Sequence, residues 1–247
     1  MAGADIQLYD PLHTPKPVAR DVWIVDGPAA KFGVGGVTLP FPTRMTLVRL
    51  GGRGLFIHSP TPLAPEVREA VARLGAPAWL IGPNRLHYLW LAEWRQAYPH
   101  AEAWLAPRLK QQAGQGLGFE GRTLDRDEGY PWDGEIATLP VTGRFMTEVV
   151  FFHRASRTLI LTDLIENFEP RRIRSRMMRL LVRLGGAEAP DGQMPRDMRM
   201  TYPRDELREA VQRMLAWDPE RVILAHGAWF EQDGAARLRR AFRWLLD

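Results

Sequence analysis

The sequence contains no cysteine, which excludes disulfide bonds and any metal site built on thiolate ligands. A bound metal ion would therefore need histidine, aspartate, glutamate or water as its ligands. Lysine is scarce, with only three residues at positions 16, 31 and 110, so arginine supplies nearly all of the positive charge. No run of about 18 apolar residues is present, and the N-terminus lacks a basic start followed by an apolar stretch. We therefore expect neither a membrane span nor a signal peptide, and we expect a cytoplasmic protein.

The composition that remains is that of a globular protein. The chain has 247 residues, of which 45% are hydrophobic and 25% are charged, and this length can bury a core without covalent staples. The formal net charge of +4 favours anionic partners at long range but does not by itself indicate nucleic acid. We expect residues 1–20, which contain three prolines, to form an extended arm. Residues 21–247 contain no segment typical of a linker and are expected to form one domain.

Apolar segments of two kinds alternate along the chain. Short alternating or continuous runs predict strands over residues 21–26, 45–50, 54–58, 78–81, 101–105, 147–153, 157–162 and 221–225. Amphipathic spacing predicts helices over residues 66–74, 86–98, 204–217 and 229–246. Residues 111–133 are expected to be irregular, and the glycines at 33–36 lack the Lys-Ser/Thr of a phosphate-binding loop and predict a turn. The strand–helix order with short connections predicts an α/β fold with helices covering a sheet.

Four side chains that can bind metal stand at or just after predicted strand ends. His58 and His226 each close a strand, His87 follows the strand that ends at residue 81, and Asp163 closes the strand over 159–163. In layered α/β folds, ligands bind at strand ends and in the loops that follow them. These residues are therefore candidate metal ligands. The alternative for each histidine is that it caps a helix or bonds to a loop.

The order of these features from Asp21 onward resembles that of the metallo-β-lactamase superfamily. Residues 55–59 are similar to an early strand that normally ends in aspartate, and residues 80–88 are similar to the segment that normally reads His-x-His-x-Asp-His. Arg144 stands where a histidine is usual, Asp163 matches the bridging aspartate, and His226 matches the final histidine. The resemblance implies a four-layer αββα sandwich, in which two mixed sheets are flanked by helices and the ligands lie along one edge.

This chain departs from the superfamily pattern at the first metal position. The three histidines of that position correspond to Pro83, Arg85 and Arg144, and neither proline nor protonated arginine binds a cation. The second position keeps Asp163 and His226. The resemblance thus implies a single mononuclear site of His87, Asp163 and His226, with His58 nearby. Imidazole and carboxylate ligands suit zinc, iron or manganese, and three protein ligands leave a position for activated water.

Several phrases look more specifically like one uncharacterised bacterial and plant family within the superfamily, domain of unknown function 4336. They span residues 83–87, 147–154 and 156–164. The site that this resemblance implies would also be lined by Asn84 and Tyr88, of which Tyr88 could be a ligand, a pocket wall or part of the core. Arg85, Arg144 and His87 could together form an anion pocket, because guanidinium groups bind carboxylate or phosphate with two hydrogen bonds. Alternatively, Glu148 could neutralise Arg144 as a buried ion pair.

An arginine-rich amphipathic segment follows Asp163. Its six arginines are Arg171, Arg172, Arg174, Arg176, Arg179 and Arg183, and the apolar residues between them fall on one helical face. Such a helix could bind an anionic membrane surface or nucleic acid. It could equally pack on its own domain, or on a second subunit in a homodimer.

Three functions are compatible with the sequence. The first is a mononuclear metal-dependent hydrolase of an anionic or ester-like substrate, whose catalytic residues the sequence does not identify. The second is a binding or scaffold protein that has kept the fold and lost the metal centre. The third is a protein that binds an anionic partner through the arginine-rich helix.

Overall fold

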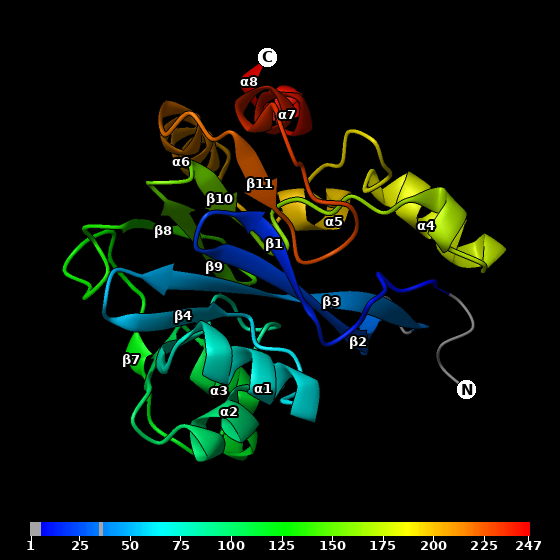
Figure 1. Ribbon diagram of the computed structural model, residues 1–247. Coiled ribbons are helices and arrows are strands. Elements are labelled where there is room, and N and C mark those ends of the chain that lie inside the picture. The colour runs from blue at the N-terminus through cyan, green and yellow to red at the C-terminus, as the bar shows by residue number, and fades with distance from the viewer. Residues whose placement is uncertain (1–5, 35–36) are drawn as a thin grey trace.

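The computed structural model, which describes residues 6–34 and 37–247, contains two mixed β-sheets packed face to face with helices outside (Figure 1). This is the α/β sandwich that the resemblance implied. The first sheet has the order β1-β2-β3-β4-β5-β6-β7 and the second the order β11-β10-β9-β8. Both sheets combine antiparallel and parallel pairs because some strands are joined by hairpin turns and others by helical crossovers.

The first sheet begins as an antiparallel ribbon and continues as parallel strands. β1 to β4 pair antiparallel, and β4 to β7 pair parallel. Its strands are β1 (Pro15–Ala19), β2 (Val22–Val34), β3 (Val37–Leu50), β4 (Gly54–His58), β5 (Pro77–Gly82), β6 (Glu102–Leu105) and β7 (Arg122–Thr123). Apolar side chains of its outer face pack against helices α1 (Pro65–Leu74), α2 (Leu91–Ala97) and α3 (Leu109–Ala113).

The second sheet is smaller and carries the C-terminal helices. Its strands are β8 (Ile136–Thr142), β9 (Thr147–His153), β10 (Thr158–Ile160) and β11 (Arg221–Ile223), with α6 (Arg204–Ala216), α7 (Gly234–Ala241) and α8 (Arg243–Leu246) outside. The side chains of β9 alternate between faces. Val149 and Phe151 join the core between the sheets, whereas Val150 and Phe152 pack under these helices. β9 is therefore buried on both sides, which explains why all seven of its residues are buried.

Aromatic rings fill the space between the two sheets. Trp132 contacts Phe56, Trp79, Trp104 and Phe151, with ring centroids 5.1 to 6.4 Å apart and edge-to-face orientations. Edge-to-face packing brings the positive edge of one ring to the negative face of another. The two sheets are thus joined by a rigid aromatic core, which fixes the strand ends that carry the site.

Some expected elements have different bounds. The helix expected over 86–98 begins only at Leu91, because residues 83–90 form a loop held by the side chain of Asn84. β8 was not anticipated, and the strand expected over 21–26 extends to Val34 as half of a long hairpin. Residues 15–19 of the expected arm form β1. The rest of that arm and the turn at 33–36 lie partly outside the described residues.

The arginine-rich segment contains a short 3₁₀ turn, η2 (Pro170–Arg172), followed by helix α4 (Arg176–Gly185), which lies at the periphery on the right of Figure 1. Ser175 caps α4 by accepting a hydrogen bond from the Met178 N–H, and Gly186 ends it at a φ of 80°. A short helix, α5 (Arg196–Arg199), completes the insertion between β10 and α6.

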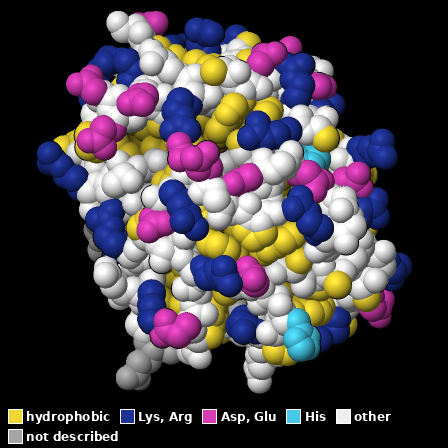
Figure 2. Space-filling model, turned by 90° about the vertical axis from the view of Figure 1, so that its left-hand side faces the viewer, with side chains coloured by type: hydrophobic (Ala, Val, Ile, Leu, Met, Phe, Trp, Pro, Cys, Tyr) yellow, Lys and Arg dark blue, Asp and Glu magenta, His cyan; other side chains and the backbone are white. Residues whose placement is uncertain are grey.

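The apolar side chains of α4 are unusually exposed. Met178 is buried, but Met177, Leu180, Leu181 and Leu184 are 40% to 57% exposed. The opposite side of the molecule, on the left of Figure 1, shows basic and acidic side chains interspersed (Figure 2). Among the described residues, no helix has the length and hydropathy needed to cross a bilayer.

Candidate metal centre

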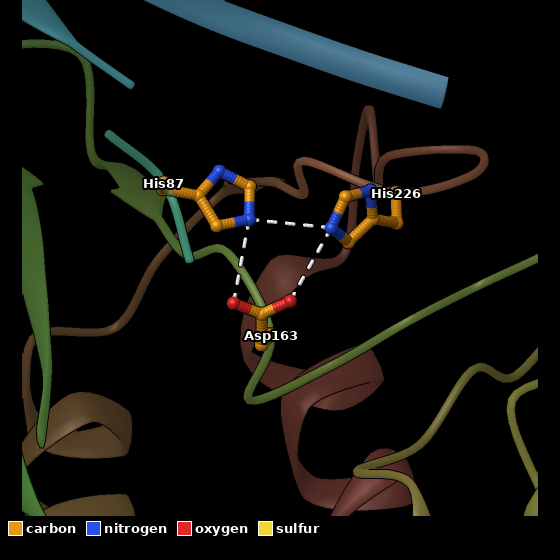
Figure 3. A group of neighbouring side chains, drawn as sticks. All are labelled: His87, Asp163 and His226. Atoms are coloured by element: carbon orange, nitrogen blue, oxygen red, sulfur yellow. Dashed lines mark hydrogen bonds and ion pairs between the residues drawn. The ribbon is translucent and has the colours of Figure 1, made fainter. Parts of the chain in front are cut away.

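Three of the residues singled out in the sequence converge at one point, His87, Asp163 and His226 (Figure 3). The Nε2 atoms of the two histidines are 3.2 Å apart, and each lies 3.3 Å from a different oxygen of the Asp163 carboxylate. All three residues are buried. The arrangement therefore presents two imidazole nitrogens and a carboxylate to a common centre.

The topology explains why residues so far apart in sequence meet. His87 lies in the loop after β5, Asp163 three residues beyond β10, and His226 three residues beyond β11. β10 and β11 are parallel neighbours, so their carboxyl ends lie at the same edge of the sheet. Gly227 lets the His226 loop approach closely, because a Cβ there would lie 2.0 Å from the carbonyl oxygen of Asn167.

Each imidazole is oriented by its other ring nitrogen. Nδ1 of His226 lies 2.7 Å from the carbonyl oxygen of Pro42, which can only accept, so this nitrogen carries a proton. Nδ1 of His87 lies 2.7 Å from Oγ of Ser59. Such bonds direct the Nε2 atoms to the centre, which is the arrangement usual for histidines that ligate metals.

The Asp163 carboxylate is oriented by Asn84. Nδ2 of Asn84 donates to Oδ2 of Asp163 at 2.5 Å and to Oγ1 of Thr162 at 2.9 Å. Its Oδ1 accepts the backbone N–H groups of Leu86 and His87. One buried amide thus links the His87 loop to the Asp163 loop.

Glu148 fixes the backbone beneath the centre. Its buried carboxylate accepts the N–H groups of Thr162, Asp163 and Leu164 at 2.7 to 3.0 Å. Burial and the charge of Asp163 raise the pKa of Glu148 to about 7, although the backbone donors favour its charged form. The alternative that Glu148 pairs with Arg144 is wrong, because Glu148 binds these backbone groups and the Arg144 side chain is exposed.

The charges of the centre favour a cation. Burial alone would raise the pKa of Asp163, but attraction to His87 and hydrogen bonds from both histidines hold it far below its usual range. Burial would lower the pKa of His226, yet its hydrogen bond and attraction to Asp163 raise it. Because Nδ1 of His226 is protonated, a neutral His226 would turn a lone pair toward Asp163. A proton or a metal ion at the centre removes that repulsion.

The donor set also fits a metal ion by its spacing. Ligands at about 2.0–2.1 Å from a tetrahedral ion are about 3.3 Å from one another. The two Nε2 atoms, 3.2 Å apart, match that edge length, and one donor atom from each of the three residues lies within 4.8 Å of the others. The residues present therefore fit one metal ion.

His58 is not part of this group. Three of the four predicted ligands have donor atoms within 4.8 Å of one another, and His58 is not among them. It is buried at the end of β4, and its Nε2 has no hydrogen-bond partner. Burial, and secondarily the nearby His87, lower the pKa of His58 to about 3, so this imidazole stays neutral.

The residues that the resemblance aligns with the first metal position bond to other parts of the protein. The Pro83 carbonyl accepts the Val149 N–H at 2.8 Å. Arg85 donates to the Phe145 carbonyl and to Gln112, with its guanidinium 4.5 Å from the Phe145 ring centroid. The backbone of Arg144 bonds to Thr201 and Arg108. Tyr88 is partly buried against the core beneath α1 and α2.

A cavity of about 750 Å³ reaches the centre from one side. Asp163, Glu166 and His226 line one part of it, and apolar residues of α4 line another. Burial raises the pKa of Glu166 to about 8, an effect that His226 opposes and Asp163 reinforces. Asp163 and Glu166 thus place two carboxyl groups at this end of the cavity.

Sequence reasoning missed several residues that position the centre. Ser59 has a φ of 52° and reaches His87 through its hydroxyl, but a serine after a strand gives no such signal. Buried Arg44 binds Asp26 and donates to the carbonyls of Leu224 and Gly227, on either side of His226. Only the three-dimensional contacts identify these roles.

Ser59, His87 and Asp163 follow the order hydroxyl, imidazole and carboxylate that serves nucleophilic catalysis in serine hydrolases. Ser59 is buried, however, and the cavity beside it has a volume of only about 10 Å³. A substrate does not fit there. The hydroxyl is therefore assigned to orienting His87.

Comparisons with known proteins agree with this fold. Residues 20–175 match the model of a family described as Domain of unknown function (DUF4336). Among solved structures, the chain is similar to a metallo-β-lactamase from Pontibacter korlensis (12% identity, 94% of this chain and 98% of that chain, TM-score 0.59). It is also similar to one from Erythrobacter litoralis with β-mercaptoethanol in the active site (11% identity, 98% and 99%, TM-score 0.62). The curated protein sequences contain no match. At such identities the structural likeness establishes the fold alone.

Proposed function

The chain belongs to the DUF4336 family and has the metallo-β-lactamase fold, and from this premise we propose that it is a mononuclear metal-dependent hydrolase of an ester-like or anionic substrate. One observation carries the proposal. Two imidazole nitrogens and a carboxylate lie 3.2 to 3.3 Å apart, and Asp163 and His226 line a cavity large enough for a substrate. The ions that suit these donors are zinc, iron and manganese.

The roles of the chain's own residues follow from their contacts. His87, Asp163 and His226 would hold the ion, while Ser59, the Pro42 carbonyl and Asn84 orient them. A divalent ion supplies Lewis-acid activation of water. The cavity wall positions the substrate beside Asp163 and His226 and limits access of bulk water.

The direct test is the metal content of protein purified without an affinity tag. We expect about one equivalent per chain in the parent, because three protein donors make a complete site. A His87→Ala, His226→Ala double variant should contain none. The control is His100→Ala, which removes an exposed histidine and should keep the metal. If parent and variants all lack metal and melt alike, the hydrolase proposal is overturned and a binding or scaffold function takes its place.

Proton release gives a second readout. Glu148 and Glu166 have raised pKa values, about 7 and about 8, so both are partly protonated near neutral pH. A divalent ion nearby favours their charged forms and should release protons when it binds. Calorimetric titration with zinc in buffers of different ionisation enthalpy measures this release. Binding without it would contradict the charge distribution described for the centre.

Ser59→Ala separates metal-dependent hydrolysis from attack by serine. If Ser59 only orients His87, the variant should retain hydrolysis of a simple ester such as p-nitrophenyl acetate and lose about tenfold in metal affinity. Complete loss of hydrolysis with metal still bound would instead make Ser59 the nucleophile.

A second candidate function, association with an anionic membrane surface, is favoured by α4. Met177 and Leu180 are 55% and 56% exposed, and the helix also presents exposed arginines such as Arg179 and Arg183. Exposed apolar side chains beside basic ones are typical of interfacial helices, whereas nucleic acid needs only the charges. The protein should therefore co-sediment with vesicles of phosphatidylglycerol and not with vesicles of phosphatidylcholine. Equal sedimentation by both, or salt-sensitive binding to nucleic acid alone, would overturn this candidate.

A further inference from the structure

The large cavity beside the candidate metal centre has two chemically different ends. At one end lie Asp163 and His226. Away from them the wall is apolar and comes from separate segments, with Phe41 from β3, Phe168 from the loop after β10, and Met178 with Leu181 from α4. The volume of about 750 Å³ falls within the range of sites that hold drug-sized ligands, which is about 300–1,000 Å³. A short, polar substrate would leave most of this apolar wall without a partner.

The charges around the cavity favour a neutral reactive group. Among the described residues that line it, Arg196 is the only lysine or arginine, and Asp197 is adjacent to it. Asp163 and Glu166 line the end nearest the centre, which therefore has no lysine or arginine among its described residues. Apart from an ion held at the centre, a polyanion would meet few cations here, whereas an uncharged ester with a hydrocarbon chain would meet apolar side chains along its length.

We propose that the cavity binds the acyl chain of long-chain carboxylic esters, with the ester group beside Asp163 and His226, the two residues of the candidate centre that line it. This inference rests on the proposed hydrolase function and names its substrate class. In the reaction, water oxygen forms a bond to the acyl carbon and the bond from that carbon to the alcohol oxygen breaks. The alcohol takes a proton from water, and the products are a fatty acid and an alcohol.

Helix α4 provides a matched pair of positions for a test. Leu181 lines the cavity, and its neighbour Leu180 does not. Both side chains are exposed, by 40% and 56%, so neither substitution removes a buried core contact. Leu181→Glu would place a carboxylate against the acyl chain, whereas Leu180→Glu changes the same helix by the same charge outside the cavity.

The first measurement is binding of the methyl ester of cis-parinaric acid, whose fluorescence rises in apolar surroundings, to metal-free protein. We expect saturable binding to the parent, competition by methyl palmitate and none by methyl acetate. Leu181→Glu should weaken binding by about tenfold or more, because a desolvated charge faces the chain. Leu180→Glu should stay within about twofold of the parent, as expected for a surface substitution. Thermal melts of both variants check folding. No binding to the parent, or equal losses in both variants, would overturn the inference.

The second measurement uses p-nitrophenyl esters of increasing acyl length. Each added methylene buried in the cavity should raise kcat/KM by about two- to fourfold until the cavity is full. Leu181→Glu should flatten this dependence, and Leu180→Glu should not. Because binding of the methyl ester to metal-free protein needs no ion, such binding in a protein that neither takes up metal nor hydrolyses esters would refute only the proposed function. Hydrolysis of the acetate ester, with no chain-length preference and no binding of the long-chain methyl ester, would refute only this inference.

Discussion

Two neighbouring regions differ in what their side chains bind: the residues that the resemblance aligns with a kept metal position (the retained position) and those that it aligns with a substituted one (the replaced position). At the retained position, His87, Asp163 and His226 turn donor atoms toward a common centre, and each is oriented by a second partner. At the replaced position, Pro83 and Arg85 make bonds with the segment around β9 and with Gln112. One region directs its donor atoms toward a common centre, and the other satisfies its polar groups within the protein. The difference shows that backbone carbonyls and guanidinium groups can join loops where the resemblance implies that metal ligands have been substituted.

Arginine side chains make most of the bonds that join these loops. Arg108, at a φ of 67°, donates to the carbonyls of Gly143 and Arg144, and Arg85 donates to that of Phe145. The loop between β8 and β9 is thus tied to the loops after β5 and β6. Guanidinium groups suit this role because they carry several donors in a fixed plane.

The largest loss of stability is expected when Glu148, beneath the retained position, is replaced. Replacing it with alanine leaves three buried N–H groups beneath the retained position without an acceptor. The free energy of unfolding in urea should fall by about 3–5 kcal/mol, since each such group costs about 1–3 kcal/mol. Glu135→Ala, which removes a half-exposed carboxylate paired with Arg53, is the control and should cost under about 1 kcal/mol. Similar losses in both variants would mean that Glu148 is not a special support.

A smaller loss of stability is expected when the candidate ligand Asp163 is replaced by a residue of the same size. Asp163→Asn keeps the shape but removes the charge that attracts both histidines. We expect a loss of about 2 kcal/mol in unfolding free energy for metal-free protein, smaller than deleting a buried partner outright. Bound metal, measured by elemental analysis, should also disappear. Asp191→Asn, at an ion pair on the surface with Arg240, should change neither quantity. Full metal occupancy in Asp163→Asn would contradict the assignment of the retained position.

His58 should make stability depend on pH. Its pKa is about 3 in the folded chain and 6.5 when unperturbed, so below pH 6.5 the unfolded chain binds a proton that the folded chain does not. Its contribution to stability is therefore complete above pH 6.5 and is lost as pH falls toward 3, by up to about 1.4 kcal/mol per pH unit. His58→Leu should reduce the slope of unfolding free energy against pH in this window. An unchanged slope would show that His58 is protonated in the folded protein.

The smallest change in stability is expected from a substitution at the replaced position. The Arg144 side chain is exposed, and the contacts that hold this residue come from its backbone. Arg144→Ala should change unfolding free energy by less than about 0.5 kcal/mol and leave metal content and ester hydrolysis unaltered. A loss of metal in this variant would break the comparison, because it would show that the two positions still act together.

The sequence predicts the architecture better than the details of the site. Strand-end residues such as Asp163 and His226 were identified because the carboxyl ends of strands are a general location of ligands. β8 was missed, since Pro140 interrupts an otherwise apolar segment and strands within a sheet rarely contain proline. The helix expected from residue 86 begins late because Asn84 takes the N–H groups of Leu86 and His87. Such tertiary hydrogen bonds override local helical spacing.

The partners of the ligands were beyond the reach of sequence alone. The Pro42 carbonyl and the Ser59 hydroxyl act through distances of 2.7 Å across segments 184 and 28 residues apart. No local pattern encodes contacts of that kind. The cavity is formed by side chains from β3, α4, α5 and several loops, so its size also emerges only after folding.

The contacts of Arg44 bear on the order in which parts of the chain fold. Its guanidinium is buried and bonds to carbonyls 180 and 183 residues later in the chain. Contacts of such sequence separation form slowly, because a long loop must close first. During synthesis, the hairpin of β2 and β3 leaves the ribosome long before Leu224 and Gly227 exist, and Arg44 can then contact Asp26 and the Tyr9 ring but not these carbonyls. His226 is thus among the last residues to find its place, and a nascent or truncated chain cannot complete the centre.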